Sequence, residues 1–170
     1  MIKHLWGVYA PWLNWGNLLS TVRFHRDSMA FVSTLGTIPR GPVVKADSRV
    51  LVTGGTGFIG SHFIDALVEQ GVRPRVLVRG TSDTSRLPVP NIDLITGSLE
   101  DSDSLARAVS AVEVVIHIAA ITKASTQKEY LSANAAGTQA LVDAMRSAEP
   151  RPRRLVYLSS LAAAGPVLDG

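Results

Sequence analysis

The sequence predicts an α/β protein built on a doubly wound, five-stranded parallel sheet. From Arg49 onward, short runs rich in β-branched residues alternate with segments of helical periodicity. The runs are apolar on both faces or nearly so, which is typical of parallel strands covered by helices on both sides. A glycine-rich segment joins the first run to the first helical segment. Because sequential parallel strands are joined by right-handed crossovers, we expect the strand order 3-2-1-4-5.

Each expected strand is a short, bounded run in which apolar side chains dominate. The first reads RVLVT and the fifth reads RLVYLS. The expected strands are residues 49–53, 75–78, 92–96, 114–118 and 154–159. Their lengths match those of ordinary strands and are too short for most helices.

Three segments between the runs have helical spacing and recognisable ends. Residues 58–70 place apolar side chains on one side, and Gly71 follows as a residue suited to the left-handed end of a helix. Residues 102–110 begin with acidic side chains, which the helix dipole favours. Residues 128–148 carry an apolar stripe that contains Asn134, and prolines after residue 148 end this helix.

Length and composition favour one domain with a buried core and exclude several kinds of site. The chain has 170 residues, of which 46% are hydrophobic and 18% charged. The absence of cysteine excludes disulfides and thiolate metal sites and favours a reducing compartment, here expected to be the cytoplasm. The four histidines lack metal-ligand spacing, so we expect no metal site. The net charge of +3 arises within residues 1–48, and the balanced remainder offers no basic patch for nucleic acid.

Residues 1–48 differ from the rest and are expected to be a poorly structured N-terminal extension and linker. Their opening run holds Trp6, Trp12 and Trp15 but is too polar and interrupted to span a membrane, which takes about 20 mostly apolar residues. Three interpretations stay open: an unstructured extension or mis-set start with Met29 as the true start, an interfacial or partner-binding segment, and a targeting segment. Binding of the tryptophans to a membrane surface is the weakest of the functional hypotheses, so we do not expect a membrane partner.

The run GGTGFIG, residues 54–60, follows the first expected strand and opens the first expected helix. Its glycines satisfy both G-x-G-x-x-G and G-x-x-G-x-x-G, spacings that let the backbone turn tightly and approach a pyrophosphate at a helix N-terminus. A P-loop would require lysine after the last glycine, and Ser61 stands there instead. The context favours dinucleotide binding, and a bare strand-to-helix turn is the alternative.

Arg79 occupies the end of the second expected strand, about 20 positions after the glycine run, where NAD-binding proteins carry an acidic residue. A guanidinium cannot accept a hydrogen bond from a ribose hydroxyl, but it can hold a 2′-phosphate. Arg79 therefore favours NADP over NAD, with Thr81, Ser82 and Arg86 available to assist. The alternative is a solvated arginine at the end of a strand.

Five motifs in order resemble the extended short-chain dehydrogenase/reductase family of NAD-dependent epimerase/dehydratase type. They are VTGGTGFIGSHF, ITGSLEDSDSL, VVIHIAA, NAAGTQALVDA and LVYLSSLAAAG, and they cover residues 49 to about 166. The resemblance implies a Rossmann-type sheet and makes residues 49–170 an incomplete NAD(P)-binding domain. It concerns only the N-terminal part of such proteins.

The resemblance implies three groups of cofactor-binding residues. The group at the pyrophosphate is Gly54, Gly57, Phe58, Ile59 and Gly60. The group at the adenosine is Arg79, Ser98 and Leu99. The group at the nicotinamide side and the active site is Ala119, Ala120, Asn134 and Ser159. The family usually carries aspartate at the position of Ser98, so one adenine contact is expected to be weaker or lost.

The resemblance also implies one catalytic residue. Ser160, five residues before Gly165, matches the serine that hydrogen-bonds the substrate oxygen. Ser159 is adjacent, and the register leaves either serine open for this role. For Asn134 the alternative is a helix-interior amide that bonds to backbone.

The family's Tyr-x-x-x-Lys pair does not occur in this sequence. In the family the tyrosine acts as acid or base, and the lysine lowers its pKa and holds the nicotinamide ribose. Leu13, Asn134 and Leu161 stand four residues after the three tyrosines. We therefore interpret the chain as the cofactor-binding N-terminal portion, truncated before the later strands and the substrate lobe and inactive alone. Its fifth strand is expected to be an exposed edge that favours aggregation or pairing with another chain.

The expected function is that of an NAD(P)-dependent oxidoreductase, epimerase or dehydratase. The resemblance implies a small-molecule substrate of the sugar-nucleotide, steroid-like or flavanol-like class, and it leaves a homodimer open for the full-length form. The alternative from another class is a non-catalytic NAD(P)-binding or sensing module, which an intact glycine loop without the catalytic pair would suit.

Overall fold

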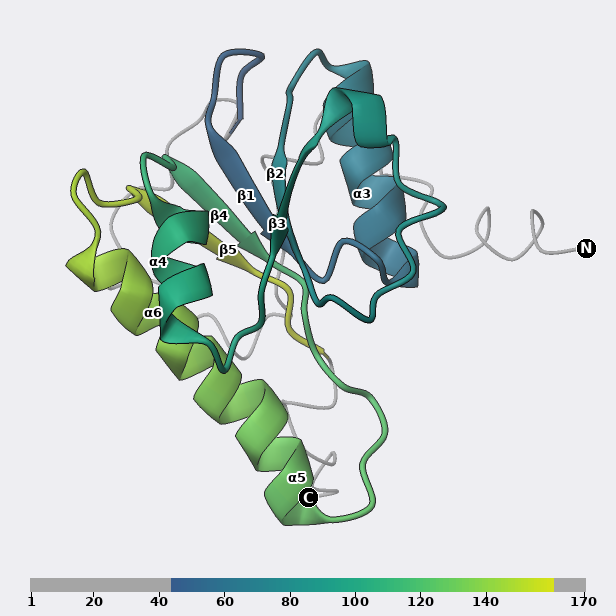
Figure 1. The fold of residues 1–170 in the computed structure, drawn as a ribbon, viewed down its shortest axis with the longest axis vertical. Helices are drawn as coiled ribbons and strands as arrows, with labels where there is room; N and C mark the ends of the chain where they lie inside the picture. The colour runs from purple at the N-terminus through teal and green to yellow at the C-terminus, as the bar shows by residue number, and fades with distance from the viewer. Residues whose placement is uncertain (1–43, 161–170) are drawn as a thin grey trace, which may run out of the picture. The chain divides into compact units, whose positions relative to one another are not determined.

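A five-stranded, all-parallel sheet in the order β3-β2-β1-β4-β5 forms the centre of the protein (Figure 1). The computed structural model describes residues 44–160, so the predictions for the tryptophan-rich extension lie outside the described residues. The strands are β1 (Val50–Thr53), β2 (Arg75–Val78), β3 (Asp93–Thr96), β4 (Val114–His117) and β5 (Arg154–Tyr157). The predicted fold class and strand order are confirmed, although four of the predicted strands extend one or two residues too far. Within residues 44–160, β3 and β5 are the edge strands.

Helices cover both faces of this sheet. Helix α3 (Phe58–Glu69) lies on one face, and α4 (Ser102–Val109) and α6 (Gly137–Ser147) lie together on the other (Figure 1). Successive side chains of a strand point to opposite faces, so the same strands supply two cores. This is why the strand sequences are apolar without alternation.

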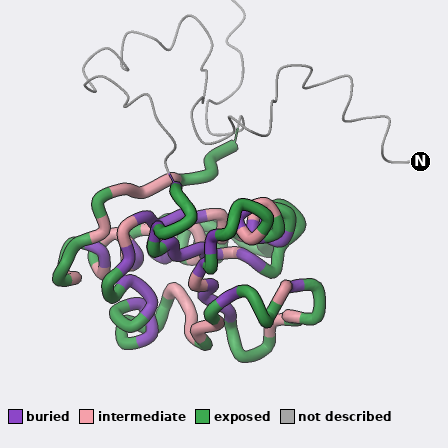
Figure 2. The backbone as a smooth tube through the Cα atoms, turned by 90° about the horizontal axis from the view of Figure 1, so that it is seen from above, coloured by how far each residue is buried: buried purple, intermediate pink, exposed green. Residues whose placement is uncertain are grey.

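One core of the described residues lies between the sheet and the α4–α6 pair. Leu51 of β1 and Val115 of β4 pack there with Leu105 and Leu141, and none of the four is more than 1% exposed. On the other face, Ile64 and other inward side chains of α3 are buried. Figure 2 shows these buried stretches gathered in the interior, with exposed stretches around them.

The ends of two helices follow from particular residues. Gly71 has a φ of +77°, and its N–H donates to the Val68 carbonyl while the Val72 N–H donates to the Leu67 carbonyl, which closes α3 in a Schellman motif. Asp101 caps α4, because its carboxylate accepts from the N–H groups of the first turn. Those hydrogen bonds hold the pKa of Asp101 below its ordinary value. The expectations for Gly71 and for the acidic start of α4 are confirmed.

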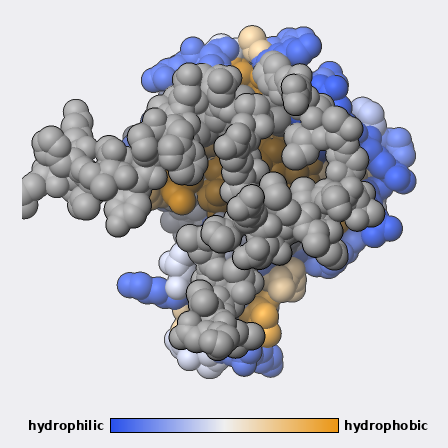
Figure 3. Space-filling model, turned by 180° about the vertical axis from the view of Figure 1, so that it is seen from behind, coloured by the Kyte–Doolittle hydropathy of each residue, from blue (hydrophilic) through white to orange (hydrophobic). Residues whose placement is uncertain are grey.

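The prediction of one α-helix over residues 128–148 is wrong in its middle. The structure has α5 (Gln127–Leu131), a π-helical segment η4 (Ser132–Ala136) and then α6. Of these three segments only α6 lies on the sheet, and Tyr130 of α5 is 44% exposed because α5 projects beyond the sheet. The space-filling view from behind shows apolar side chains on this lower, projecting part (Figure 3).

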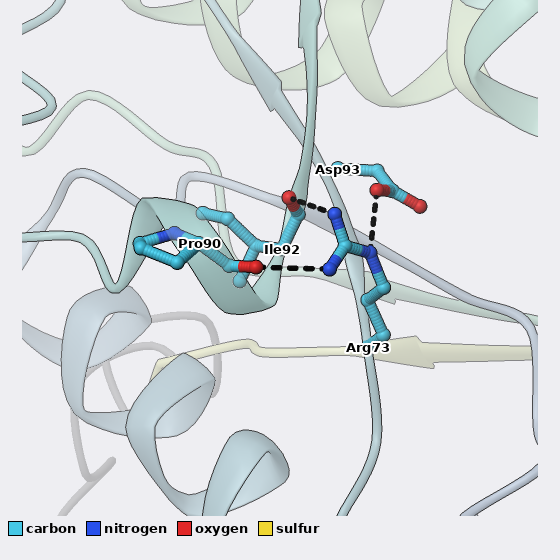
Figure 4. Close-up of polar contacts among 4 residues, drawn as sticks. All are labelled: Arg73, Pro90, Ile92 and Asp93. Carbon is cyan, nitrogen blue, oxygen red and sulfur yellow. Dashed lines mark hydrogen bonds and ion pairs between the residues drawn. The ribbon is translucent and has the colours of Figure 1, made fainter.

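Arg73 holds the connection between β2 and β3 (Figure 4). Its Nε donates to Asp93 at 2.7 Å, and its other nitrogens donate to the carbonyls of Pro90 and Ile92. Pro90 lies within the short 3₁₀ turn η3 (Val89–Asn91) that leads into β3, and Ile92 directly follows this turn. Because the ion pair is largely exposed, its main effect is to fix this turn and not to add much stability.

Truncation of Leu141 should test the burial of α6. Leu141→Ala should lower the free energy of unfolding by about 2–5 kcal/mol, because the fully buried side chain leaves a cavity. Leu131→Ala, at a position 54% exposed on the same helical run, should change it by less than about 0.5 kcal/mol. Urea unfolding followed by circular dichroism measures both, and equal losses would contradict the observed packing.

Candidate functional site

A hollow of about 570 Å³ opens at the carboxyl ends of the strands. Its walls come from the carboxyl ends of strands and the segments after them, within residues 53–60 at β1, 77–82 at β2, 97–100 at β3 and 118–122 at β4, and Ala133 of the later helical run also lines it. The volume lies in the range of ordinary ligand and cofactor sites. The hollow also lies where the strand order reverses between β1 and β4, the place at which open α/β sheets bind ligands.

The glycine loop forms the wall beside α3 and is closely packed. Gly54 has a φ of +76°, and a Cβ there would lie 2.5 Å from the backbone nitrogen of Ala119. A Cβ on Gly60 would overlap the carbonyl oxygen of Gly54. Side chains therefore cannot replace these two glycines without a shift of the loop, which goes beyond what a simple strand-to-helix turn needs.

The N-terminus of α3 faces the hollow through Gly57, Phe58 and Ile59, which all line it. None of the described side chains caps this helix end. The first backbone N–H groups of a helix have no partner within the helix and carry partial positive charge. This end of α3 can therefore accept an anionic group.

Arg79 and Ser82 form the wall after β2. The Ser82 N–H donates to the Arg79 carbonyl at 2.9 Å, which closes a turn directly after the strand. Arg79 is exposed and takes part in none of the ion pairs found within residues 44–160. Its guanidinium charge is thus available at the hollow, which Ser82 also lines.

The wall after β3 is held by the start of α4. The Ser98 N–H donates to the hydroxyl of Ser104, a residue fully excluded from solvent. The Ser98 hydroxyl accepts from the Glu100 N–H, so it supports its own turn. Leu99 packs beside Gly137 of α6, where an added Cβ would lie 3.2 Å from its side chain.

The wall after β4 is fastened to the long helical segment. Asn134, within η4, accepts a hydrogen bond from the Ile121 N–H at 2.8 Å and donates one to the Ile121 carbonyl at 3.0 Å. Asn134 therefore bonds to backbone, and the backbone that it bonds lines the hollow. Ala119 and Ala120 line the same wall with small side chains.

A buried histidine lies directly beneath this wall. His117, the last residue of β4, is fully excluded from solvent, and burial lowers its pKa. Its Nδ1 lies 2.6 Å from the hydroxyl of Thr53, and its Nε2 lies 2.9 Å from the hydroxyl of Thr138. Its ring also stacks on Tyr157.

The structure brings most of the predicted site residues to one hollow. Those that line it are Gly54, Gly57, Phe58, Ile59, Gly60, Arg79, Ser98, Leu99, Ala119 and Ala120. Asn134 reaches the lining only through Ile121. Ser159 and Ser160 follow β5 at the same edge of the sheet, are exposed, and are not part of the lining.

Sequence reasoning missed several residues of the site. Thr53, Gly97 and Ile121 line the hollow, and His117 and Thr138 support it from beneath. The sequence feature that identifies His117 is its position inside the apolar run VVIHI, where a buried polar side chain needs hydrogen-bond partners. Within residues 44–160 there is no cluster of three potential metal-binding side chains, and none of the helices there has the length and apolarity of a membrane span.

Comparison with protein families finds one that matches most of the chain. The model of the NAD dependent epimerase/dehydratase family matches residues 50–169. The match begins at β1 and includes every strand and helix described above.

Individual relatives are considerably longer than this chain. Ceramide reductase of Caulobacter vibrioides is 38% identical over 120 residues, which are 71% of this chain and 37% of that protein. The 3-beta-hydroxysteroid dehydrogenase of Mycolicibacterium neoaurum is 34% identical over 129 residues, with 70% and 34% covered. The structure of UDP-glucose 4-epimerase from Brucella ovis in complex with NAD is similar with a TM-score of 0.62 and 33% identity, covering 70% of this chain and 38% of that one.

The buried His117 should make stability depend on pH. The unfolded chain binds a proton at the ordinary histidine pKa of 6.5, whereas the folded chain resists it, so the unfolded state takes up the proton first. The free energy of unfolding should therefore fall as the pH drops below 6.5, by at most about 1.4 kcal/mol per pH unit. Urea unfolding between about pH 7.5 and pH 5 measures this slope.

Two asparagine variants identify the source of that slope. His117→Asn should remove its histidine part, and His62→Asn, at an exposed position, should leave it in place. A slope unchanged in His117→Asn would assign the effect to other groups.

Proposed function

The chain belongs to the NAD dependent epimerase/dehydratase family, and from that premise we propose that residues 49–170 are the NAD(P)-binding part of an oxidoreductase, epimerase or dehydratase. One observation carries the proposal: the glycine loop, Arg79 and the Ala119–Ala120 turn, far apart in sequence, line one hollow at the switch point of the sheet. Each of these walls has a chemistry suited to a different part of a dinucleotide.

The glycine loop is the proposed site of the pyrophosphate. The backbone N–H groups of Phe58 and Ile59 at the uncapped start of α3 would donate to its oxygens. Gly54 and Gly60 are positions that a Cβ could not occupy, so the loop is compact and leaves its backbone open to the ligand. A cradle of this kind fits a dinucleotide.

The wall with Arg79 and Ser82 is the proposed site of the adenosine ribose. An unpaired guanidinium beside a hydroxyl suits a 2′-phosphate, which supports NADP over NAD. Ser98 and Leu99 would flank the adenine. The Ser98 hydroxyl already accepts from the Glu100 N–H, so it would contribute less to adenine than the aspartate usual in the family.

The wall after β4 is the proposed nicotinamide side, where Ala119, Ala120 and Ile121 line the hollow. When bound, the nicotinamide would supply hydride transfer. The chain would orient the ring through the turn that Asn134 fastens. Ser160 is the proposed donor to a substrate oxygen, with Ser159 as the alternative in that register.

The complete activity is proposed for the longer protein that the relatives represent. This chain spans 37% of ceramide reductase and 34% of 3-beta-hydroxysteroid dehydrogenase. No Tyr-x-x-x-Lys occurs in the 170 residues. We therefore assign cofactor binding to these residues and expect no turnover from them alone. The names of the relatives support a small-molecule alcohol or ketone as the substrate of the longer protein.

Cofactor binding should raise the midpoint of thermal unfolding. NADPH at a hundredfold excess over its dissociation constant should stabilise the chain by about 2.7 kcal/mol. Gly60→Ala should lower the affinity for NADPH at least tenfold and so reduce this stabilisation, because the added methyl would overlap the Gly54 carbonyl. Gly80→Ala is the matched control, since a Cβ there would only make ordinary contact with Thr96. Full stabilisation of Gly60→Ala would count against the proposed cradle.

Replacement of Arg79 should separate the two cofactors. Arg79→Ala should lower the affinity for NADPH about 10- to 100-fold through loss of a charged contact to the 2′-phosphate, and should leave NADH binding unchanged. Calorimetric titration with each nucleotide gives the ratio of affinities. Arg73→Ala removes an arginine that hydrogen-bonds Asp93, so it should not change the ratio of the NADPH and NADH affinities. An equal loss for both nucleotides would contradict the assignment.

A further inference from the structure

Thr138 is the junction of a buried polar chain beneath the nicotinamide wall. Its hydroxyl donates to the Asn134 carbonyl at 2.6 Å and lies 2.9 Å from Nε2 of His117. The other ring nitrogen of His117 lies 2.6 Å from the Thr53 hydroxyl. The chain thus connects β1, β4 and α6 and ends on η4.

Counting hydrogens assigns a direction to each of these bonds. The single hydroxyl hydrogen of Thr138 is used on the Asn134 carbonyl, so Thr138 accepts from Nε2–H of His117. Burial keeps the imidazole neutral, so Nδ1 is an acceptor and the Thr53 hydroxyl donates to it. The Thr53 oxygen is then free to accept from the Ala119 N–H, at 3.4 Å.

Both ends of this chain reach the same turn of the hollow. At one end, Thr53 accepts from Ala119. At the other, the side chain of Asn134 bonds both the N–H and the carbonyl of Ile121. The turn between these two residues is therefore held by polar groups that do not line the hollow, apart from Thr53.

We propose that Thr138 is a positioning residue of the nicotinamide side, which fixes the Ala119–Ile121 turn through His117 at one end and Asn134 at the other. The proposal rests on the proposed cofactor function. Thr138 itself lies outside the lining of the hollow, so it would act on the ligand only through this turn.

Removal of the Thr138 hydroxyl would disturb this turn in a specific way. Thr138→Val keeps the shape but leaves Nε2–H of a fully buried ring without an acceptor. Movement of the imidazole proton to Nδ1 would relieve this, but Thr53 would then accept from Nδ1–H, which would compete with the Ala119 N–H for the same oxygen. The glycine loop and Arg79 belong to other segments and would keep their positions.

Two nucleotides that differ only in the nicotinamide ring test this directly. Whichever of NADPH and NADH binds better is compared with the same molecule lacking that ring, 2′-phospho-ADP-ribose or ADP-ribose. Thr138→Val should lower the affinity for the complete nucleotide about tenfold and change that of the shorter one by less than about twofold. Thr138→Ser, which keeps the hydroxyl, should restore both. Equal losses for the two ligands, or no loss for either, would overturn the proposal.

Hydrogen exchange tests the positioning without any ligand. The amides of Ala119 and Ile121 should exchange faster in Thr138→Val and at the original rate in Thr138→Ser. The Gly57 amide, bonded to the Gly54 carbonyl at 3.1 Å, is the internal control and should not change. Unchanged exchange at Ala119 and Ile121 would refute the role of Thr138. Failure of the unaltered chain to bind any of the nucleotides would instead refute the proposed function, and the exchange result would still decide the role of Thr138.

Discussion

The close approach of the glycine loop to the turn after β4 is the constraint on which the rest of the site depends. A Cβ on Gly54 would lie 2.5 Å from the Ala119 nitrogen, so only a bare backbone fits between them. Because β1 and β4 are neighbours in the sheet, this contact brings two walls of the hollow together. The start of α3 follows from the same packing, since a Cβ on Gly60 would overlap Gly54. The close packing at Gly54 therefore links the start of α3, the turn after β4 and the position of the hollow.

The parallel sheet places further segments beside that contact, so the hollow has several walls. All strands run in the same direction, so the segments that leave their carboxyl ends meet at one edge. Each segment brings a different chemistry: helix N–H groups after β1, a guanidinium after β2, and small apolar side chains after β4. Variation in one segment can therefore change a single contact of the ligand while the sheet stays the same.

The parts predicted well from sequence are those that depend on neighbours along the chain. Strand runs, the glycine spacing and Gly71 as a helix end are local signals, and the structure has them where they were expected. The roles of His117 and Thr138 depend on partners 64 and 21 residues from the histidine, for which the sequence offers no spacing rule. The π-helical turn η4 was not predicted either, and the contact of Asn134 with Ile121 in another segment likewise follows no spacing rule.

Buried polar side chains hold the irregular segments of the walls in position through hydrogen bonds to their backbone. Turns leave backbone groups unpaired, and burial makes each unpaired group costly. Ser104 bonds the turn after β3, Ser61 bonds the first turn of α3, and Thr53 bonds the turn after β4. Within residues 44–160, every buried side-chain nitrogen and oxygen has a hydrogen-bond partner. The apolar core can hold the strands without such bonds, so the buried hydroxyls and the imidazole around the hollow indicate that the fold uses polar contacts where irregular backbone must be held in position.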